Sequence, residues 1–204
     1  MERNLRAFLA ILLTLIGQHA TGASAAKYQP QEGDVLFQSM PHNPLTDTIE
    51  AATSSPFSHC GLAHRTVDGW IVIEAIGPVK ETPINEWTAR GRGGAYTVFR
   101  VKEKYREKIP AFVKAAQGYE GLPYDIHYEF DDRAIYCSEL IFKAFRTATG
   151  EELGKVQALG NLKLDGHEDF IRSIEDGSIP RERKMITPQS LSEASQLEKI
   201  HESK

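Results

Sequence analysis

The amino-acid sequence predicts an α+β domain in which an antiparallel sheet packs against a helix. Residues 58–76 contain two strand-like segments joined by Asp68-Gly69, and a two-residue connection of this kind is typical of a tight β-hairpin. The segment that runs from Cys137 to Gly150 repeats apolar side chains at helical spacing. These apolar positions are Leu140, Ile141, Ala144, Phe145 and Ala148. The hairpin and this helix are the two units to which we relate the rest of the chain.

Several segments have the composition and spacing of strands. Strands are rich in β-branched and aromatic residues and are bounded by residues that favour turns. In chain order, the expected strands are 34–38, 58–67, 70–76 and 95–101, with a weaker candidate at 181–187. Residues 77–94 contain two prolines and a glycine-rich run, so we expect a loop there with a turn of helix near 84–89.

Helices are expected between and after these strands. The expected helices are 45–53, 109–118, the helix that begins at Cys137, a short one within 151–166, and 168–175. Pro110 suits the first turn of the second helix, where a proline is tolerated. Residues 122–133 mix aromatic and acidic side chains and are expected to be irregular.

The first 25 residues have the pattern of a secretory signal peptide. Two arginines precede the apolar run 7–16, and small residues follow up to Ala25. The run is about half of the ~20 residues that a transmembrane helix needs, so we expect cleavage and export, to the periplasm of a Gram-negative-type bacterium. An uncleaved membrane-tethering segment is the alternative. We expect the mature chain to have no membrane span, one domain at 26–190 and a polar C-terminal tail at 191–204.

The charge of the chain argues against a nucleic-acid partner. The formal net charge is −4, and removing Glu2, Arg3 and Arg6 with the signal peptide changes it to −5. The sequence also has no stripe of lysine and arginine interleaved with aromatic residues. We therefore expect a substrate that is not a nucleic acid.

A cysteine stands where the expected helix begins. The unpaired N–H groups and the positive end of the helix dipole favour an anion there, so the Cys137 thiol is expected to form the reactive thiolate. The alternative is a small, unreactive core cysteine. Cys60 adds another alternative, because an exported protein with two cysteines can form one disulfide.

A thiol hydrolase also needs a base beside the sulfur. Among the seven histidines, His59 and His64 lie on an expected strand, where side chains alternate between two faces. His59 shares a face with Ala63, and we expect Cys60 on the opposite face, away from Cys137. This placement argues against a disulfide between the cysteines. A histidine bonded only to backbone is the structural alternative for His59.

Glu74 is the candidate for the group that orients the histidine. With Asp68-Gly69 as the turn, Glu74 lies opposite Ala63, on the face of His59. It is also the only carboxylate in the apolar run 70–76, where an unpaired charge is costly. An edge-strand carboxylate that reaches solvent is the alternative. A metal site built from the strand histidines and the cysteines has suitable atoms, but these histidines point to opposite faces, so no metal and no cofactor are expected.

Five short motifs carry most of the chemically informative residues. They are Gly33-Asp-Val-Leu-Phe37, Ser58-His-Cys-Gly-Leu62, Val72-Ile-Glu-Ala75, Leu122-Pro-Tyr-Asp125 and Tyr136-Cys-Ser-Glu-Leu140. Together they closely resemble the permuted papain-like amidases of the YiiX/YaeF type, a branch of the NlpC-type cysteine hydrolases. The resemblance spans residues 33–150, and the motifs that contain Cys137 and His59 are its most specific parts.

The resemblance implies a circularly permuted papain-like fold, in which the histidine-bearing sheet precedes the cysteine-bearing helix. It places the family's nucleophile on Cys137, its histidine on His59 and its third polar residue on Glu74. It also implies a mobile region that covers the substrate, here at 40–57. The implied function is an exported cysteine hydrolase that cleaves amide bonds, in cell-wall-related peptides, through an acyl-enzyme.

Two other functions stay open. The fold also resembles relatives of lecithin–retinol acyltransferase, so a lipid acyl hydrolase or acyltransferase is one alternative. Its apolar channel is expected to be lined by Met40, Phe57, Tyr124 and Phe130. A non-catalytic envelope domain with a Cys60–Cys137 disulfide is the other. For an enzyme, the residues expected to bind a peptide, a peptidoglycan fragment or a lipid-like substrate are Phe57, Tyr124 and Tyr136.

Overall fold

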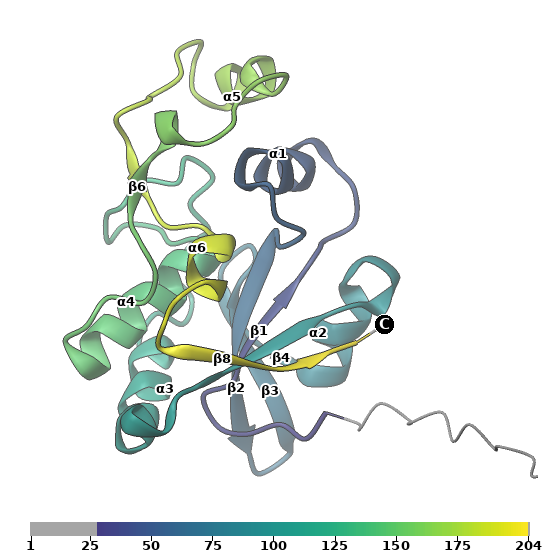
Figure 1. Ribbon diagram of the computed structural model, residues 1–204, viewed down its shortest axis with the longest axis vertical. Coiled ribbons are helices and arrows are strands. Elements are labelled where there is room, and N and C mark those ends of the chain that lie inside the picture. Colours follow the sequence, from purple (N-terminus) through teal and green to yellow (C-terminus); the bar gives the residue numbers. More distant parts are fainter. Residues whose placement is uncertain (1–27, 204) are drawn as a thin grey trace, which may run out of the picture.

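Six antiparallel strands form one sheet in the order β4-β3-β2-β1-β5-β8 in the computed structural model, which describes residues 28–203 (Figure 1). The strands are β1 (Val35–Gln38), β2 (His59–Thr66), β3 (Gly69–Ala75), β4 (Val79–Pro83), β5 (Thr97–Val101) and β8 (Leu197–Glu202). Two short strands, β6 (Gln157–Ala158) and β7 (Lys184–Met185), pair separately. The signal peptide expected at 1–25 lies outside the described residues.

Helices lie against both faces of the sheet (Figure 1). They are α1 (Pro44–Thr53), α2 (Ile84–Arg90), α3 (Ile109–Gln117), α4 (Cys137–Thr149), α5 (Glu168–Ile174) and α6 (Pro188–Ser192), with 3-10 turns η1 (Arg92–Gly94), η2 (Glu103–Lys108) and η3 (Leu159–Asn161). The neighbouring helices α3 and α4 pack on one face and α2 on the other, which confirms the α+β class. In the part of the chain that is described, no helix is long and apolar enough to cross a membrane.

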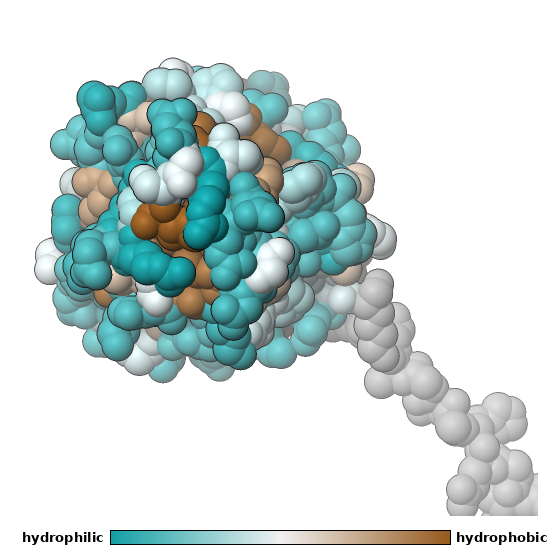
Figure 2. Space-filling model, turned by 90° about the horizontal axis from the view of Figure 1, so that it is seen from above, coloured by the Kyte–Doolittle hydropathy of each residue, from teal (hydrophilic) through white to brown (hydrophobic). Residues whose placement is uncertain are grey.

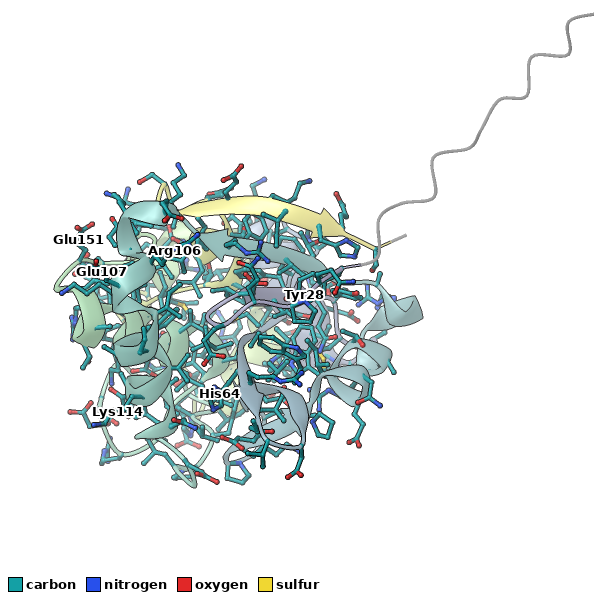
Figure 3. All side chains as sticks on the ribbon, turned by 90° about the horizontal axis from the view of Figure 1, so that it is seen from below. Tyr28, His64, Arg106, Glu107, Lys114 and Glu151 are labelled. Carbon is teal, nitrogen blue, oxygen red and sulfur yellow. The ribbon has the colours of Figure 1, made fainter. Side chains whose placement is uncertain are left out.

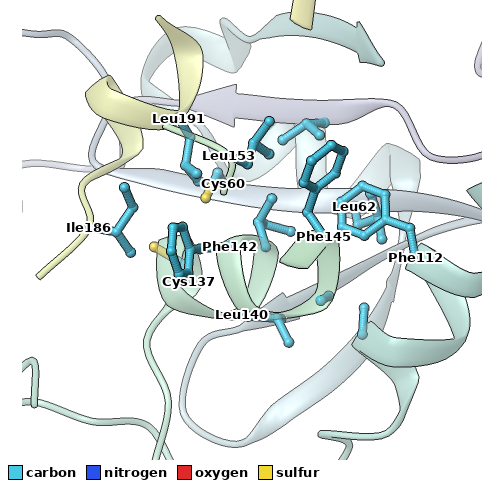
Figure 4. Close-up of a cluster of buried hydrophobic side chains, with 14 of the residues drawn as sticks. Cys60, Leu62, Phe112, Cys137, Leu140, Phe142, Phe145, Leu153, Ile186 and Leu191 are labelled. Carbon is cyan, nitrogen blue, oxygen red and sulfur yellow. The ribbon is translucent and has the colours of Figure 1, made fainter. Parts of the chain in front are cut away.

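The main core fills the space between the sheet and α4. Leu140 and Phe145 of α4, Phe112 of α3 and Leu62 of β2 are each at most 1 % exposed. The rings of Phe145 and Phe112 meet edge to face, with centroids 5.5 Å apart. Burial of side chains of this size stabilises the fold by about 2 kcal/mol each. Figure 4 shows that the cluster continues from this packing to both cysteines, so the core also fixes where α4 begins.

The outer side of η2 and α3 is polar. Arg106, Glu107 and Lys114 are exposed and lie on the outside of the molecule (Figure 3), whereas Phe112 of the same helix is buried. Pro110 stands in the first turn of α3, as the sequence predicts. The polar outer side and the apolar inner side give α3 the amphipathic character of a helix at the surface of a domain.

The β2–β3 hairpin differs from the expected one in its turn. The two-residue loop is Val67-Asp68, and Thr66 pairs with Gly69, which has a φ of 139° that favours glycine. Ala63 therefore lies opposite Val72, not opposite Glu74. A shift of two residues leaves every side chain on its original face, because the side-chain period of a strand is two. It also moves Glu74 two positions along the strand towards His59, which is the first residue of β2.

The C-terminal residues form part of the sheet, which corrects the expectation of a polar tail at 191–204. Residues 197–202 are β8, and Leu197 pairs with Val101 of β5. Leu191 in α6 is fully buried. The segment looked like a tail because an edge strand carries charged residues on its open side. Residues 79–83, which were expected to lie in a loop, form the opposite edge strand, β4.

Candidate active site

The imidazole of His59 and the carboxylate of Glu74 form a buried pair across the hairpin. His59 Nε2 lies 2.6 Å from Glu74 Oε2, and the two residues are 4 % and 0 % exposed. The contact shows that both side chains share a face, as strand alternation predicts. Burial favours the protonated form of Glu74, but hydrogen bonds from His59, Arg90 and Thr82 outweigh it and lower its pKa to about 2. Glu74 is therefore ionised at neutral pH.

Three residues that were absent from the sequence prediction hold this pair in place. The Thr82 hydroxyl donates to Glu74 Oε1 at 2.6 Å, and Arg90 donates to the same oxygen at 2.7 Å. The ring of Trp87 stacks on the imidazole of His59, with centroids 5.9 Å apart and planes at 29°. Thr82 comes from β4 and the other two from α2. The only sequence signal for these three residues is Trp87, a large aromatic residue in the mostly polar segment 84–90.

Cys137 meets this pair at the start of α4, where the sequence predicts it. Nε2 of His59 bonds Glu74, which leaves Nδ1 as the ring nitrogen available to Cys137, whose hydrogen bond contributes to the pKa shift of His59. The pKa of the Cys137 thiol is lowered by hydrogen bonds from Cys60 and from His59, although burial opposes this. Burial also opposes the charging of His59, but hydrogen bonds to Cys137 and Glu74 raise its pKa to about 9. At neutral pH these shifts favour a thiolate beside an imidazolium.

Cys60 lies beside Cys137, which corrects the expectation that the two are kept apart. Hydrogen bonds from the side chain and from the backbone of Cys60 are both among the causes that lower the pKa of Cys137, so the two residues are in contact. Figure 4 shows the two sulfurs at one end of the same cluster. The alternation itself holds, because Cys60 packs with α4 while Ala63 packs with Trp87. The expectation failed because α4 packs on the sheet face that carries Cys60. The helix also begins near His59, the first residue of β2, so both residues lie close to Cys137. Both thiols are free, and the argument from opposite faces against a disulfide no longer applies.

The three residues expected to bind substrate, Phe57, Tyr124 and Tyr136, differ in their contacts. Tyr136 has no exposed surface, and its hydroxyl accepts the backbone N–H of Ile186 at 3.0 Å. This bond ties the start of α4 to the segment between β7 and α6, and substrate contact by Tyr136 stays a prediction. Phe57 packs on an aromatic ring of β1, and the hydroxyl of Tyr124 lies 3.1 Å from that of Tyr128. Substrate contact by Phe57 and Tyr124 stays a prediction.

An apolar groove opens beside Cys137. Its walls come from α1, α5, the loop between β6 and α5, and the segment between β7 and α6. Side chains that line it include Ile49, Ala52, Leu162, Ile171, Ile174 and Ile186. Figure 2 shows hydrophobic surface in a hollow with a hydrophilic border, on the side where α1 and α5 lie in Figure 1. The four residues expected to line an apolar channel do not line this groove.

The fold and this group of side chains define a class of protein. A cysteine at the start of a helix, beside a histidine that a third polar side chain orients, is the arrangement of papain-like cysteine hydrolases. The family described as permuted papain-like amidases, YaeF/YiiX, C92 family, matches residues 29–201, and the chain belongs to this family. It is therefore a member of a family of cysteine hydrolases.

Two relatives support this assignment. An uncharacterised protein, YiiX of Escherichia coli strain K12, is 34 % identical over 176 residues, which cover 85 % of this chain and 87 % of that protein. The crystal structure of YiiX from Escherichia coli O157:H7, described as a metalloprotein, has a TM-score of 0.81 and 33 % identity. The match covers 86 % of this chain and 99 % of that one, so the similarity extends over the whole fold.

Proposed function

We propose that this protein cleaves amide bonds by transferring the acyl group through Cys137 to water. The observation that carries the proposal is the buried position of His59, which bonds Glu74 and lowers the pKa of Cys137. The family is an amidase family, which supports an amide as the bond that is cut.

The reaction has two steps. In the first, the Cys137 thiolate attacks the carbonyl carbon, a carbon–sulfur bond forms, the carbon–nitrogen bond breaks, and His59 gives its proton to the departing amine. In the second, His59 takes a proton from water, the hydroxide attacks the thioester, and the carbon–sulfur bond breaks. Glu74 keeps the imidazole in the orientation and tautomer that both steps need.

Backbone N–H groups at the start of α4 stabilise the oxyanion in this proposal. The first N–H groups of a helix have no acceptor within the helix, and α4 begins with Cys137 itself. Negative charge on the substrate oxygen would develop next to the sulfur, at the positive end of the helix dipole.

The expected substrate is an amide in cell-wall-related peptides, and a second candidate function uses the same residues. The apolar groove beside Cys137 favours an acyl group of lipid character, which a hydrolase or an acyltransferase would remove from an ester or an amide. Both functions require a free Cys137, so neither is compatible with a Cys60–Cys137 disulfide.

A product analysis separates these functions. The purified protein and its Cys137→Ser variant are incubated with peptidoglycan fragments and, separately, with phospholipid vesicles, and soluble products are identified by mass spectrometry. Release of an amine from the first substrate by the wild type alone supports the amidase. Release of fatty acid from phospholipid supports the second function. Equal product from the variant, with thermal unfolding unchanged, would contradict both.

We also propose that the protein is exported. The basis is the signal-peptide pattern of residues 1–25. The test is cell fractionation in a Gram-negative host, followed by N-terminal sequencing of the periplasmic protein. A new N-terminus near residue 26 is the expected result, and an intact Met1 in the cytoplasmic fraction would contradict it.

The residues that the structure describes do not form a metal centre. The YiiX crystal structure is described as that of a metalloprotein. Within residues 28–203 of this chain, no group of three or more His, Cys, Asp or Glu side chains is placed to hold a metal ion. No step of the proposed reaction therefore passes through a metal.

A further inference from the structure

Cys60 is a buried nucleophile that the proposed reaction does not use. It is the second residue of β2, directly after His59, and it has no exposed surface. Its side chain belongs to the same core cluster as Cys137, and Figure 4 shows both sulfurs at one end of that cluster. Both thiols are free. Two free thiols that lie together at an active site can be oxidised to a disulfide.

The fold fixes the positions of both thiols. Cys60 lies opposite Phe37 of the neighbouring strand β1, and both residues are fully buried. Cys137 is the first residue of α4, and Leu140 of this helix is buried in the core between helix and sheet. The strand and the helix therefore hold the two sulfurs together, and neither side chain has an alternative position in solvent.

Only one of the two thiols can be reached from solvent. Cys137 lines the apolar groove and is 3 % exposed, whereas Cys60 does not line the groove and is 0 % exposed. A small molecule can therefore contact the Cys137 sulfur, but the active site of another protein cannot contact either sulfur. This access excludes a disulfide-exchanging protein as the oxidant of the folded chain and favours an oxidant of the size of a peroxide.

The two thiols also differ in their tendency to ionise. Hydrogen bonds from Cys60 and His59 lower the pKa of Cys137, and a thiolate is the form that peroxides oxidise. Burial, followed by the contact with Cys137, raises the pKa of Cys60, so Cys60 stays protonated while Cys137 carries the charge. An oxidised Cys137 is neutral, which removes part of this effect and makes the Cys60 thiol easier to ionise.

We propose that Cys137 is a peroxide-sensitive thiol and Cys60 its resolving cysteine, so that a reversible Cys60–Cys137 disulfide switches the hydrolase off. The Cys137 thiolate attacks a peroxide oxygen, a sulfur–oxygen bond forms, the oxygen–oxygen bond breaks, and the hydroxide takes the proton of His59 and leaves as water. The Cys60 sulfur then attacks the sulfenic sulfur of Cys137. The sulfur–sulfur bond forms, the sulfur–oxygen bond breaks, and the oxygen leaves as water with the Cys60 proton. Two thiols are oxidised, and hydrogen peroxide is reduced to two waters.

The disulfide has two consequences for Cys137. It removes the nucleophile, so hydrolysis stops; this part of the inference rests on the proposed function. It also protects the sulfur, because a sulfenic acid without a resolving thiol is oxidised further to sulfinic acid, which thiols do not reduce. A small thiol such as dithiothreitol attacks the disulfide at the reachable Cys137 sulfur and restores both thiols. Without an oxidant the two thiols stay free, as in the structure.

Oxidation of matched variants tests this inference. The reduced wild type, Cys60→Ala and Cys60→Ser proteins are treated with a small excess of hydrogen peroxide. The remaining thiols are alkylated, and each chain is analysed by intact mass and peptide mapping. The wild type should lose two hydrogens and contain one Cys60–Cys137 link within the chain. Both variants should instead gain two oxygens on Cys137. Serine keeps a hydroxyl at this position, so its result does not depend on the loss of a hydrogen-bond donor.

The recovery of activity is the second measurement. Product release, from whichever substrate is cleaved in the product analysis, is measured before peroxide, after peroxide and after dithiothreitol. The wild type should regain most of its activity, whereas each variant should regain less than about a tenth, because thiols do not reduce a sulfinic acid. Each protein is compared with its own starting activity, so an effect of the substitution on the basal rate does not imitate the result.

The outcomes separate the inference from the function on which it rests. Sulfinic acid on Cys137 of the wild type with Cys60 still free, or a disulfide between two chains, would overturn the resolving role of Cys60 and leave the proposed function standing. Hydrolysis that continues in the fully linked protein would overturn both the switch and the role of Cys137 as nucleophile. A reversible link in a protein that cleaves none of the substrates would overturn the proposed function alone.

Discussion

His59 and Glu74 lie on neighbouring strands of one hairpin, with His59 Nε2 only 2.6 Å from Glu74 Oε2 and both side chains buried. The carboxylate is itself held by Thr82 and Arg90. The histidine thus has one nitrogen fixed by an anion and the other directed at Cys137. This arrangement predicts how the protein responds to substitution and to pH.

Replacement of Glu74 by glutamine should lower kcat/KM by about 100-fold or more. The amide has nearly the same shape but no charge, so it stabilises neither the imidazolium nor the required tautomer. The pKa of His59 should fall below about 9, because the Glu74 hydrogen bond is one of the contacts that raise it. Kinetics and NMR titration of the His59 ring measure both effects. An unchanged rate in a folded Glu74→Gln protein would exclude the orienting role.

The pH profile should have a wide plateau. The pKa of Cys137 is lowered, chiefly by hydrogen bonds from Cys60 and His59, and that of His59 is raised to about 9. The thiolate–imidazolium pair therefore exists at neutral pH, and kcat/KM should fall as the pH rises through about 9. Activity that increases through pH 9 would mean that the thiol is not activated by the histidine.

Cys60 should help to lower the pKa of Cys137. The Cys60 thiol donates to the Cys137 sulfur, and this is the largest contribution to the lowered pKa. Cys60→Ala removes the donor and should raise the pKa of Cys137, while Cys60→Ser retains a donor and should raise it less. The rate of alkylation by iodoacetamide as a function of pH measures this pKa. Identical profiles for the alanine and serine variants would contradict the hydrogen bond.

Arg90 should control stability in acid. The folded-state pKa of Glu74 is about 2, below its ordinary value of 4.5. The resulting stabilisation is complete above pH 4.5 and is lost as the pH falls through about 2. Arg90→Met removes one of the contacts that lower this pKa, so the variant should be less stable than the wild type at neutral pH and should lose less stability between pH 4.5 and about 2. Thermal unfolding from neutral to acidic pH measures it, with the exposed Arg106→Met as the control. The same acid profile for both variants would count against this role.

The last strand should be necessary for a stable fold. Truncation after Gln196 removes β8, leaves β5 as an unpaired edge and uncovers the core beneath Leu197. The melting temperature should fall by several degrees, and aggregation should increase. Truncation after Glu202, which retains β8, is the matched control. Equal melting temperatures for the two proteins would contradict a structural role for β8.

Much of the fold could be predicted from local signals. Gly150 ends α4 with a φ of 77°, and Asn43 caps α1 by accepting the N–H of Thr46, so both helices carry their boundaries in the sequence. The strand β8 could not be predicted, because its charged residues resemble a tail until β5 is present to pair with it. The turn of the hairpin was misplaced by one residue, because the positive φ of Gly69 is used at the start of β3 and not inside the loop.

In the candidate site, too, some residues could be predicted from local patterns and others could not. His59, Glu74 and Cys137 could be named because alternation and a helix start place them without knowledge of distant contacts. Cys60 lies near Cys137 because α4 packs on the sheet face that carries Cys60. Strand alternation shows that Cys60 and His59 are on opposite faces, but it does not show which face the helix covers. Arg90 lies in α2, whose sequence is mostly polar, so its hydrogen bond to Glu74 could not be predicted without the tertiary structure.

The most direct test of the account is to identify the residue that carries the acyl group during turnover. The protein and its His59→Ala variant are incubated with an acyl donor, quenched in acid and analysed by intact mass and peptide mapping. We predict one acyl group per chain, on Cys137, and a strongly reduced amount in the variant. An acyl group on Cys60, an equal amount in both proteins, or a Cys60–Cys137 disulfide in place of any adduct would contradict the account.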